Sequence, residues 1–411
     1  MQGRRRFALN EMTSRERVLA AINHQEPDRV PIDLGGILSG VSRFAYRRLL
    51  GYLDRADLPI NISDRVQQLA EPREEILRRF GSDFRHIRAG PPDNYEEPSF
   101  GDPHASYEDY ASGATQHAFV DEWGIKWRRA AYYYDMVEHP LEGASLEDLK
   151  AYRWPDPHDP GKTRGLREKA RDLYLNTDYA LVADPASGGI LEMALWTRGF
   201  EDFYIDLGTH SKFATILLDG ITEYFLAWFG EYLDTVGDYI QIIAQGDDLG
   251  MQDRMLLPPN LYRKYIKPRH QKVIELIKSK TRAKVFHHSC GAIFPLIGDL
   301  IEIGVDILNP IQPRAEGMDT WELKRVYGQS ITFHGGVDVQ TVLPRGTTDD
   351  VVEEVKERIA SLGPGGGYIL AASHNIQADV PPENIVAMFE AAQEYGQYPL
   401  QIELSRRSDA S

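Results

Sequence analysis

The residues best suited to chemistry are His288 and Cys290, which lie two positions apart. In an extended segment, residues i and i+2 point to the same side, so this imidazole and thiolate can reach one metal ion. Zinc accepts both ligands, and a catalytic zinc site keeps one coordination position open. We therefore predict a zinc site with His374 as its third ligand. The alternative is that Cys290 is a small buried hydrophobe and the histidines are satisfied polar groups.

Other polar residues also follow short apolar segments. Asp247 and Asp248 come soon after residues 240–243, and we predict that both are catalytic. The same pair could instead cap a helix, because an aspartate carboxylate accepts hydrogen bonds from free amides at a helix start. His287 is expected to face away from His288 and pack in the wall. Three more residues at segment ends are predicted to bind substrate: Asp33, Gln312 and His334.

Eight short, apolar, β-rich segments alternate with longer helical patterns along the chain. They are residues 29–33, 84–87, 180–184, 239–243, 283–287, 306–309, 331–334 and 368–371. This alternation predicts an α/β fold, a (β/α)8 TIM barrel, with an open doubly wound sheet as the alternative. The carboxyl ends of barrel strands converge on one rim, which brings distant polar residues together. Thr347, followed by acidic residues, is a typical helix start.

The predicted domain organisation is one barrel domain over residues 1–411, with an N-terminal helical extension to about residue 28. Residues 90–160 depart from the regular alternation and form a predicted insertion. Within it, residues 117–123 and 124–127 have β-like patterns, and the aromatic run Tyr132–Tyr134 follows. This pattern predicts a hairpin with aromatic faces. It is either a lid over the barrel or an ornament on it.

Composition excludes several classes of protein. The 411 residues include 46 Lys and Arg against 62 Asp and Glu, a net charge of −16, and a single cysteine. The acidic excess disfavours nucleic acid and anionic membranes as partners. One cysteine excludes an internal disulfide and any cysteine-rich zinc site. No secretory leader and no apolar stretch of membrane-spanning length is present, so a cytoplasmic location is expected.

Three segments resemble the uroporphyrinogen decarboxylase-like superfamily: Thr13–Pro31, Gly335–Asp338 and Pro382–Ile385. The resemblance extends over roughly residues 13–395 and implies a (β/α)8 barrel. True uroporphyrinogen decarboxylases carry an R-Q-A-G-R segment after the first strand, whereas residues 33–39 here contain no arginine. Porphyrinogen decarboxylation is therefore not expected.

The chain is similar to a second branch of the superfamily, the corrinoid-dependent methyltransferases. Their zinc motif is H-x-C followed by a distant cysteine, and His288 and Cys290 match its first part. His374 stands where the distant cysteine is expected. Zinc with one thiolate and two imidazoles would keep a charge of about +1, which favours withdrawal of charge from an oxygen leaving group.

The resemblance thus implies a zinc-dependent methyltransferase that moves a methyl group from a small O-methyl donor to a corrinoid carried by a partner protein. Asp248 would assist the departing oxygen, and the aromatic insertion would form a wall for an aryl ether. The alternatives are transfer from methylcorrinoid to a thiol or folate, a metal-free lyase acting on a small carboxylic acid, and a non-enzymatic binding protein. A homodimer is left open.

Overall fold

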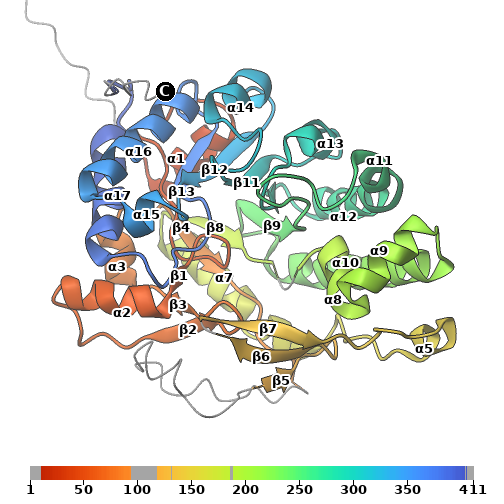
Figure 1. Ribbon diagram of the computed structural model, residues 1–411. Helices are drawn as coiled ribbons and strands as arrows, with labels where there is room; N and C mark the ends of the chain where they lie inside the picture. The colour runs from red at the N-terminus through yellow and green to blue at the C-terminus, as the bar shows by residue number, and fades with distance from the viewer. Residues whose placement is uncertain (1–10, 94–117, 131, 186–187, 403, 405–411) are drawn as a thin grey trace, which may run out of the picture.

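The protein is built on a sheet of seven parallel strands. The computed structural model describes residues 11–93, 118–130, 132–185, 188–402 and 404. The strands neighbour one another in the order β13-β12-β11-β10-β9-β8-β4, so each strand lies beside the next one along the chain (Figure 1). Their bounds are β4 Phe84–Ile87, β8 Ala180–Ala183, β9 Ile242–Gly246, β10 Lys284–His288, β11 Ile307–Ile311, β12 Thr332–Val337 and β13 Tyr368–Ala372.

A short extended segment at residues 30–33 joins the two edges of this sheet. Ile32 forms a parallel bridge with Leu370 of β13. Its carbonyl oxygen accepts a hydrogen bond from Asp83 N (2.9 Å), immediately before β4. The segment therefore occupies the position of the eighth strand of the barrel. This confirms the predicted (β/α)8 fold and excludes the open doubly wound sheet, which would leave both edges unpaired.

Helices cover the outside of the barrel, and the main core lies between them and the sheet (Figure 1). Thr347 begins α16 with a capping box that involves Asp350, as its sequence predicts. The described helical elements are α1 Ser14–Ile22, α2 Arg43–Tyr52, α3 Glu74–Arg79, α5 Leu146–Ala151, α6 Pro160–Thr163, α7 Leu166–Asn176, α8 Ile190–Arg198, α9 Phe200–Gly208, α10 Lys212–Val236, α11 Pro259–Leu261, η1 Tyr262–Ile266, α12 Lys267–Lys280, η2 Phe294–Leu296, α13 Ile297–Glu302, α14 Thr320–Tyr327, α15 Val342–Arg345, α16 Thr348–Leu362 and α17 Pro382–Tyr395.

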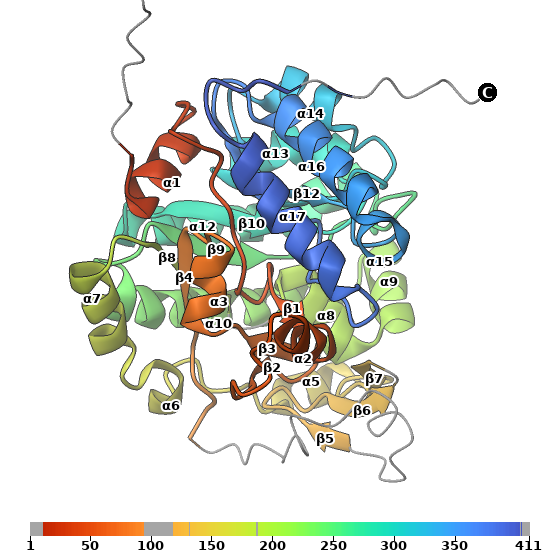
Figure 2. The ribbon, with the colours of Figure 1, turned by 90° about the vertical axis from the view of Figure 1, so that its left-hand side faces the viewer.

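The barrel interior has its own apolar cluster, closed at one end by α1. Val18 and Ile22 of α1 pack with strand residues that include Phe84 and Ile242. Figure 2 shows α1 on the side of the molecule opposite β5, β6 and β7. Among the residues described, no helix has the length and apolar character needed to cross a bilayer.

The insertion contains a three-stranded antiparallel sheet, where the sequence predicts a hairpin. Its strands are β5 Ala118–Val120, β6 Lys126–Ala130 and β7 Tyr133–Glu138. A second small sheet, β1 Val41–Ser42, β2 Asn61–Asp64 and β3 Leu69–Glu71, lies beside it (Figures 1 and 2). The two are joined where Tyr134 N donates to Val66 O (3.0 Å). Residues 94–117, which hold part of the predicted insertion, lie outside the described residues.

Candidate metal centre

The ends of two neighbouring strands bring together the residues of the candidate site. In the parallel pairing of β9 and β10, His288 lies opposite Gly246. A Cβ atom at Gly246 would come within 2.8 Å of the His288 Cβ, so glycine permits this close approach. Two residues beyond each of these positions, the chain places Asp248 and Cys290 on the same rim. Short apolar strands with polar ends therefore position the site, as expected for a parallel barrel.

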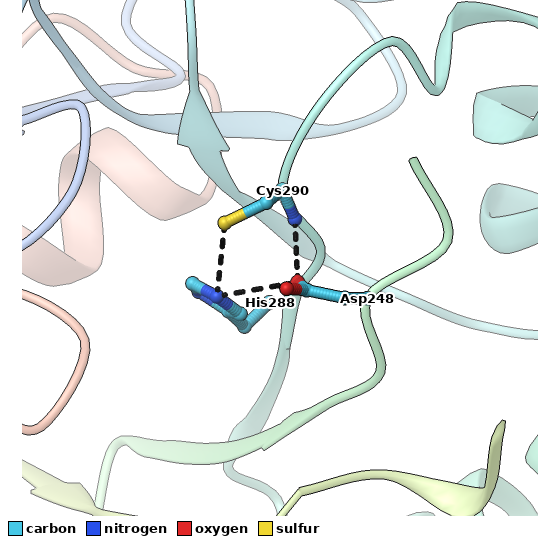
Figure 3. A group of neighbouring side chains, drawn as sticks. All are labelled: Asp248, His288 and Cys290. Atoms are coloured by element: carbon cyan, nitrogen blue, oxygen red, sulfur yellow. Dashed lines mark hydrogen bonds and ion pairs between the residues drawn. The ribbon is translucent and has the colours of Figure 1, made fainter. Parts of the chain in front are cut away.

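Asp248, His288 and Cys290 converge on one point (Figure 3). One oxygen, nitrogen or sulfur atom from each residue lies within 4.8 Å of the other two. Cys290 Sγ is 3.5 Å from His288 Nε2, and Asp248 Oδ1 is 3.6 Å from the same nitrogen. Asp248 Oδ1 also accepts a hydrogen bond from Cys290 N (2.8 Å), which fixes the carboxylate against the loop.

The chemistry of these donors fits a zinc ion. Thiolate sulfur, imidazole nitrogen and carboxylate oxygen are all common zinc ligands, and three protein ligands are typical of a catalytic site. Burial, with the nearby carboxylates of Asp248 and Glu192, raises the pKa of the Cys290 thiol well above its usual range. A divalent cation would neutralise this concentration of negative charge and favour the thiolate.

His374, predicted as the third zinc ligand, lies beside this group but is not one of its three members. Its ring centroid is 6.3 Å from that of His288. Burial and the neighbouring His288 lower the pKa of His374 to about 4, although Asp248 opposes this shift. The imidazole is therefore neutral at physiological pH. Geometry thus favours Asp248, which was predicted as a catalytic acid, over His374 as the third ligand.

Asp247, also predicted to be catalytic, has a different environment. Its two oxygens accept hydrogen bonds from Leu191 N (2.6 Å) and Glu192 N (2.8 Å) at the start of α8. His270 Nε2 also lies 2.8 Å from Asp247 Oδ2. The side chain is fully buried. These contacts make Asp247 a helix cap, the alternative that its sequence left open, and its catalytic role stays a prediction.

Asp33 and His334, predicted to bind substrate, face the barrel interior. His334 Nε2 and Asp33 Oδ2 are 2.9 Å apart, and both side chains are almost completely buried. Their polar atoms bond to each other inside the barrel, where both residues line a small cavity, and their role in substrate binding stays a prediction. Gln312 does lie at the site: its Oε1 accepts from Gly291 N (2.8 Å), and its side chain lowers the pKa of Cys290 against the dominant effect of burial.

Glu192 is a residue of this site that the sequence did not suggest. Burial, together with Asp248 and Asp247, raises the pKa of its carboxyl well above the usual range. It is the third residue of α8, and its Oε2 accepts a hydrogen bond from the backbone of the N-cap residue, Gly189 N (3.1 Å). The sequence signal available was a capping acid after Gly188 and Gly189. That signal says nothing about the proximity of β9.

An open cleft adjoins the candidate site, between the inserted sheet and the rim of the barrel. Its lining combines tyrosine rings and valines with glutamine amides, one carboxylate and one imidazole: Val66, Gln67, Tyr133, Tyr134, Asp135, Gln312, Val339, Gln340, His374 and Gln377. Over the described part of the chain, neither arginine nor lysine lines it. Such a cleft suits an uncharged, partly aromatic ligand rather than a polycarboxylate.

The family model for uroporphyrinogen decarboxylase (URO-D) matches residues 145–395. The match covers more than half of the chain, so the chain belongs to the URO-D family. The matched segment includes Asp248, His288, Cys290 and His374.

Curated relatives include both a methyltransferase and decarboxylases. A methylated-thiol–coenzyme M methyltransferase from Methanosarcina mazei is 22% identical over 268 residues, which are 62% of this chain and 65% of that protein. Uroporphyrinogen decarboxylases from Legionella pneumophila are 40% identical over 71 residues, 17% of this chain and 19% of theirs. The matches thus span less than two thirds of these relatives.

A solved methyltransferase structure from Methanosarcina mazei has a similar fold. It aligns with a TM-score of 0.61 and 18% identity, over 94% of this chain and 99% of the other. At this identity the likeness supports the barrel fold alone.

Proposed function

We propose that this protein is a zinc-dependent methyltransferase that moves a methyl group between a small molecule and a corrinoid carried by a partner protein. The observation that carries the proposal is the convergence of Asp248, His288 and Cys290 within 4.8 Å. Membership of the URO-D family and the likeness to a methyltransferase support it. The corrinoid is proposed from the resemblance of the H-x-C motif to corrinoid-dependent methyltransferases.

The proposed ligands are Asp248, His288 and Cys290, with the fourth position open to the substrate. Bound zinc would supply Lewis acidity to the oxygen or sulfur that carries the methyl group. His374, neutral and adjacent to His288, would contact the substrate at the floor of the cleft. Gln312 would hold the loop after Cys290 through its bond to Gly291 N.

An O-methyl donor, and specifically an aryl methyl ether, is our first candidate. Tyr133 and Tyr134 offer an aromatic wall, and Gln340 and Gln377 offer amides for polar substituents. The lack of lysine and arginine among the described lining residues argues against porphyrinogen carboxylates. This composition supports the donor class that the sequence suggested.

A thiol acceptor is a second candidate, favoured by the ligand set. With Asp248 in place of His374, zinc would be bound by two anions and one neutral imidazole, so the net charge falls from about +1 to about zero. A neutral zinc site suits a thiol substrate, and the relative from Methanosarcina mazei is named for transfer to coenzyme M. In this case the methyl group would move from methylcorrinoid to the thiol.

The first experiment measures zinc per chain in the purified protein and in Cys290→Ala and His288→Gln. We expect about one zinc in the wild type and little in either variant. Full retention of zinc by both variants would refute the metal site.

The second experiment separates the two directions of transfer. Zinc-loaded protein is incubated anaerobically with cob(I)alamin and 2-methoxyphenol, or with methylcobalamin and coenzyme M. Formation of methylcobalamin in the first mixture supports the O-methyl donor, and its loss in the second supports the thiol acceptor. Absence of zinc-dependent transfer in both, also with a corrinoid protein supplied, would refute the proposed function.

A further inference from the structure

A continuous chain of side-chain hydrogen bonds runs from the candidate metal ligand His288 into the barrel. His288 Nδ1 is 2.6 Å from Asn309 Oδ1, and Asn309 Nδ2 is 2.8 Å from His334 Nδ1. His334 Nε2 is 2.9 Å from Asp33 Oδ2. These residues come from β10, β11, β12 and the closing segment at residues 30–33. The chain of hydrogen bonds therefore crosses several strands of the barrel.

The chain ends on a histidine held between two carboxylates. His86 Nε2 lies 3.1 Å from Asp33 Oδ1, and His86 Nδ1 lies 2.8 Å from Asp184 Oδ1. Both ring nitrogens must carry hydrogen to donate to these carboxylates, so His86 is an imidazolium here. Ser39 Oγ adds a further donor to Asp33 (2.8 Å). Asp33 is thus fixed as an acceptor on both of its oxygens.

The acceptor character of Asp33 determines every proton position back to His288. Asp33 can only accept from His334, so His334 carries a hydrogen on Nε2, and its Nδ1, which faces the Asn309 amide nitrogen at 2.8 Å, is bare. Bare Nδ1 needs a donor, which is the amide nitrogen of Asn309. The Asn309 oxygen then faces His288 and accepts from Nδ1–H. The Nε2 atom of His288 is left with its lone pair, facing Cys290 and Asp248.

The reverse arrangement would oppose zinc binding. If Asn309 were turned over, its amide would donate to His288 Nδ1 and its oxygen would require a hydrogen on His334 Nδ1. With its one hydrogen on Nδ1, the His334 ring would then present a bare Nε2 to the Asp33 carboxylate at 2.9 Å, which pairs two acceptors. His288 would carry its hydrogen on Nε2 and could not offer that atom to a metal.

We infer that Asp33 is a positioning residue that acts through His334 and Asn309 to hold His288 in the tautomer that can bind metal through Nε2. The inference rests on the proposed metal site and gives a role to three residues that lie outside it. All three positioning side chains are almost completely buried. Water therefore has little access to these side chains and cannot readily replace the hydrogen bonds between them.

The direct test is the tautomer of His288 in metal-free protein, read by ¹⁵N NMR of the histidine rings. Spectra are taken at about pH 8, above the ordinary histidine pKa. A His288→Gln variant identifies the His288 signals. We expect the wild-type hydrogen on Nδ1 and a shift to Nε2 in Asp33→Asn, whose amide can donate to His334 and reverse the chain. Retention of the hydrogen on Nδ1 in Asp33→Asn would overturn the inference.

A second test uses zinc affinity, measured by competition with a chelator. Asn309→Leu should weaken zinc binding about 10- to 100-fold, whereas Asn309→Asp should retain most of the affinity because its oxygen still accepts from His288. The matched control is Asn384→Leu, which removes another buried amide, one that donates to Leu343 O (2.9 Å) and Gly346 O (2.8 Å). Equal affinity in Asn309→Leu and Asn384→Leu would contradict the inference.

These two readouts separate failure of the inference from failure of the proposed function. If the wild type binds no zinc, the proposed metal site is wrong, but the tautomer experiment still decides whether Asp33 sets the proton position on His288. If zinc binds and the tautomer does not respond to Asp33→Asn, only the positioning role is wrong.

Discussion

Two acid–histidine clusters occupy opposite sides of the same strand ends, and their comparison shows what separates a structural group from a candidate site. The mouth cluster is Asp248, His288 and Cys290. The wall cluster is Asp247, His270 and His287. Each contains one residue of the adjacent pairs 247–248 and 287–288. Because neighbouring residues of a strand point to opposite faces, the sequence divides these pairs between the two clusters.

The Asp247 carboxylate of the wall cluster is saturated by hydrogen bonds within the protein. Asp247 accepts from two amides at the start of α8, and His270 bonds to the same carboxylate. His287 bonds through Nδ1 to Gln245, and its ring lies 5.4 Å from that of His270. Burial, with His270 and His288 nearby, lowers the pKa of His287 well below its usual value. Asp247 therefore stabilises the fold and offers no free acceptor, whereas His287 Nε2 is buried without a hydrogen-bond partner.

The mouth cluster differs because its ligand atoms face one another and adjoin a cleft. His288 Nε2 has Cys290 Sγ and Asp248 Oδ1 as its near neighbours, at 3.5 and 3.6 Å. Ligand atoms that face one another in this way are typical of a metal or substrate site. Acids and histidines that look alike in the sequence therefore differ in what their atoms already bind, and this difference separates structural residues from candidate ligands.

The largest effect is expected where the mouth cluster loses its sulfur. Cys290→Ala should remove the bound zinc and lower methyl transfer by about three orders of magnitude, because a three-ligand site loses its thiolate. Ser289→Ala is the control, since Ser289 Oγ accepts from Leu249 N (2.9 Å) on the other face. Metal analysis and the transfer rate are measured. Equal zinc content in both variants would remove the distinction between the clusters.

Exchanging one carboxylate for an amide in each cluster should separate metal binding from stability. Asp248→Asn should weaken zinc binding about 10- to 100-fold with little change in the free energy of unfolding. Asp247→Asn should lower that free energy by about 2 kcal/mol, because the amide cannot accept from both backbone groups and His270. Chelator competition and urea unfolding measure the two quantities. The reverse pattern would assign the clusters the wrong way round.

The sequence predicted the strands of the barrel well because each is a short apolar run with polar residues at its end. It also identified His288 and Cys290, since their spacing in an extended segment places both on one side. Glu192 could not be predicted, because it reaches the site only through the cap that Asp247 makes on α8. That contact joins residues 55 positions apart and has no local pattern.

Side-chain direction was the other information missing from the sequence. Asp33 and His334 end their strands, as a substrate-binding residue would, yet their atoms bond to each other inside the barrel. His374 and Asp248 both reach the rim, and only their distances from His288 decide which joins the cluster. The ends of strands can be predicted from composition. The direction in which the side chains at those ends point depends on the twist of the strand and on the loop that follows.

The pH dependence of stability tests a third acid–histidine group, His86 between Asp33 and Asp184, in contrast to His287 of the wall cluster. Although burial opposes the charged form, Asp184 and Asp33 raise the pKa of His86 to about 10. The raised value stabilises the folded state below pH 6.5, and this contribution is lost as pH rises from about 6.5 to about 10. The free energy of unfolding should therefore fall by up to about 1.4 kcal/mol per pH unit in that range.

Replacing His86 isolates this effect. His86→Gln should flatten the decline, whereas His158→Gln, which changes an exposed histidine paired with Glu231 (3.4 Å), should leave it unchanged. Urea unfolding at several pH values provides the measurement. An unchanged slope in His86→Gln would show that the two carboxylates do not hold His86 charged, and that burial governs His86 as it governs His287.

The smallest effect is expected at the cleft beside the mouth cluster. Tyr133→Leu removes an aromatic ring from the cleft lining and should raise KM for an aryl methyl ether about three- to tenfold with little change in kcat, because the ring contributes substrate contact but no reacting group. Tyr52→Leu, at an exposed position of α2, is the matched control. Steady-state kinetics with 2-methoxyphenol distinguish the two constants. A fall in kcat without a change in KM would place Tyr133 in the chemistry, and equal KM values for the two variants would mean that the aryl group binds away from the inserted sheet.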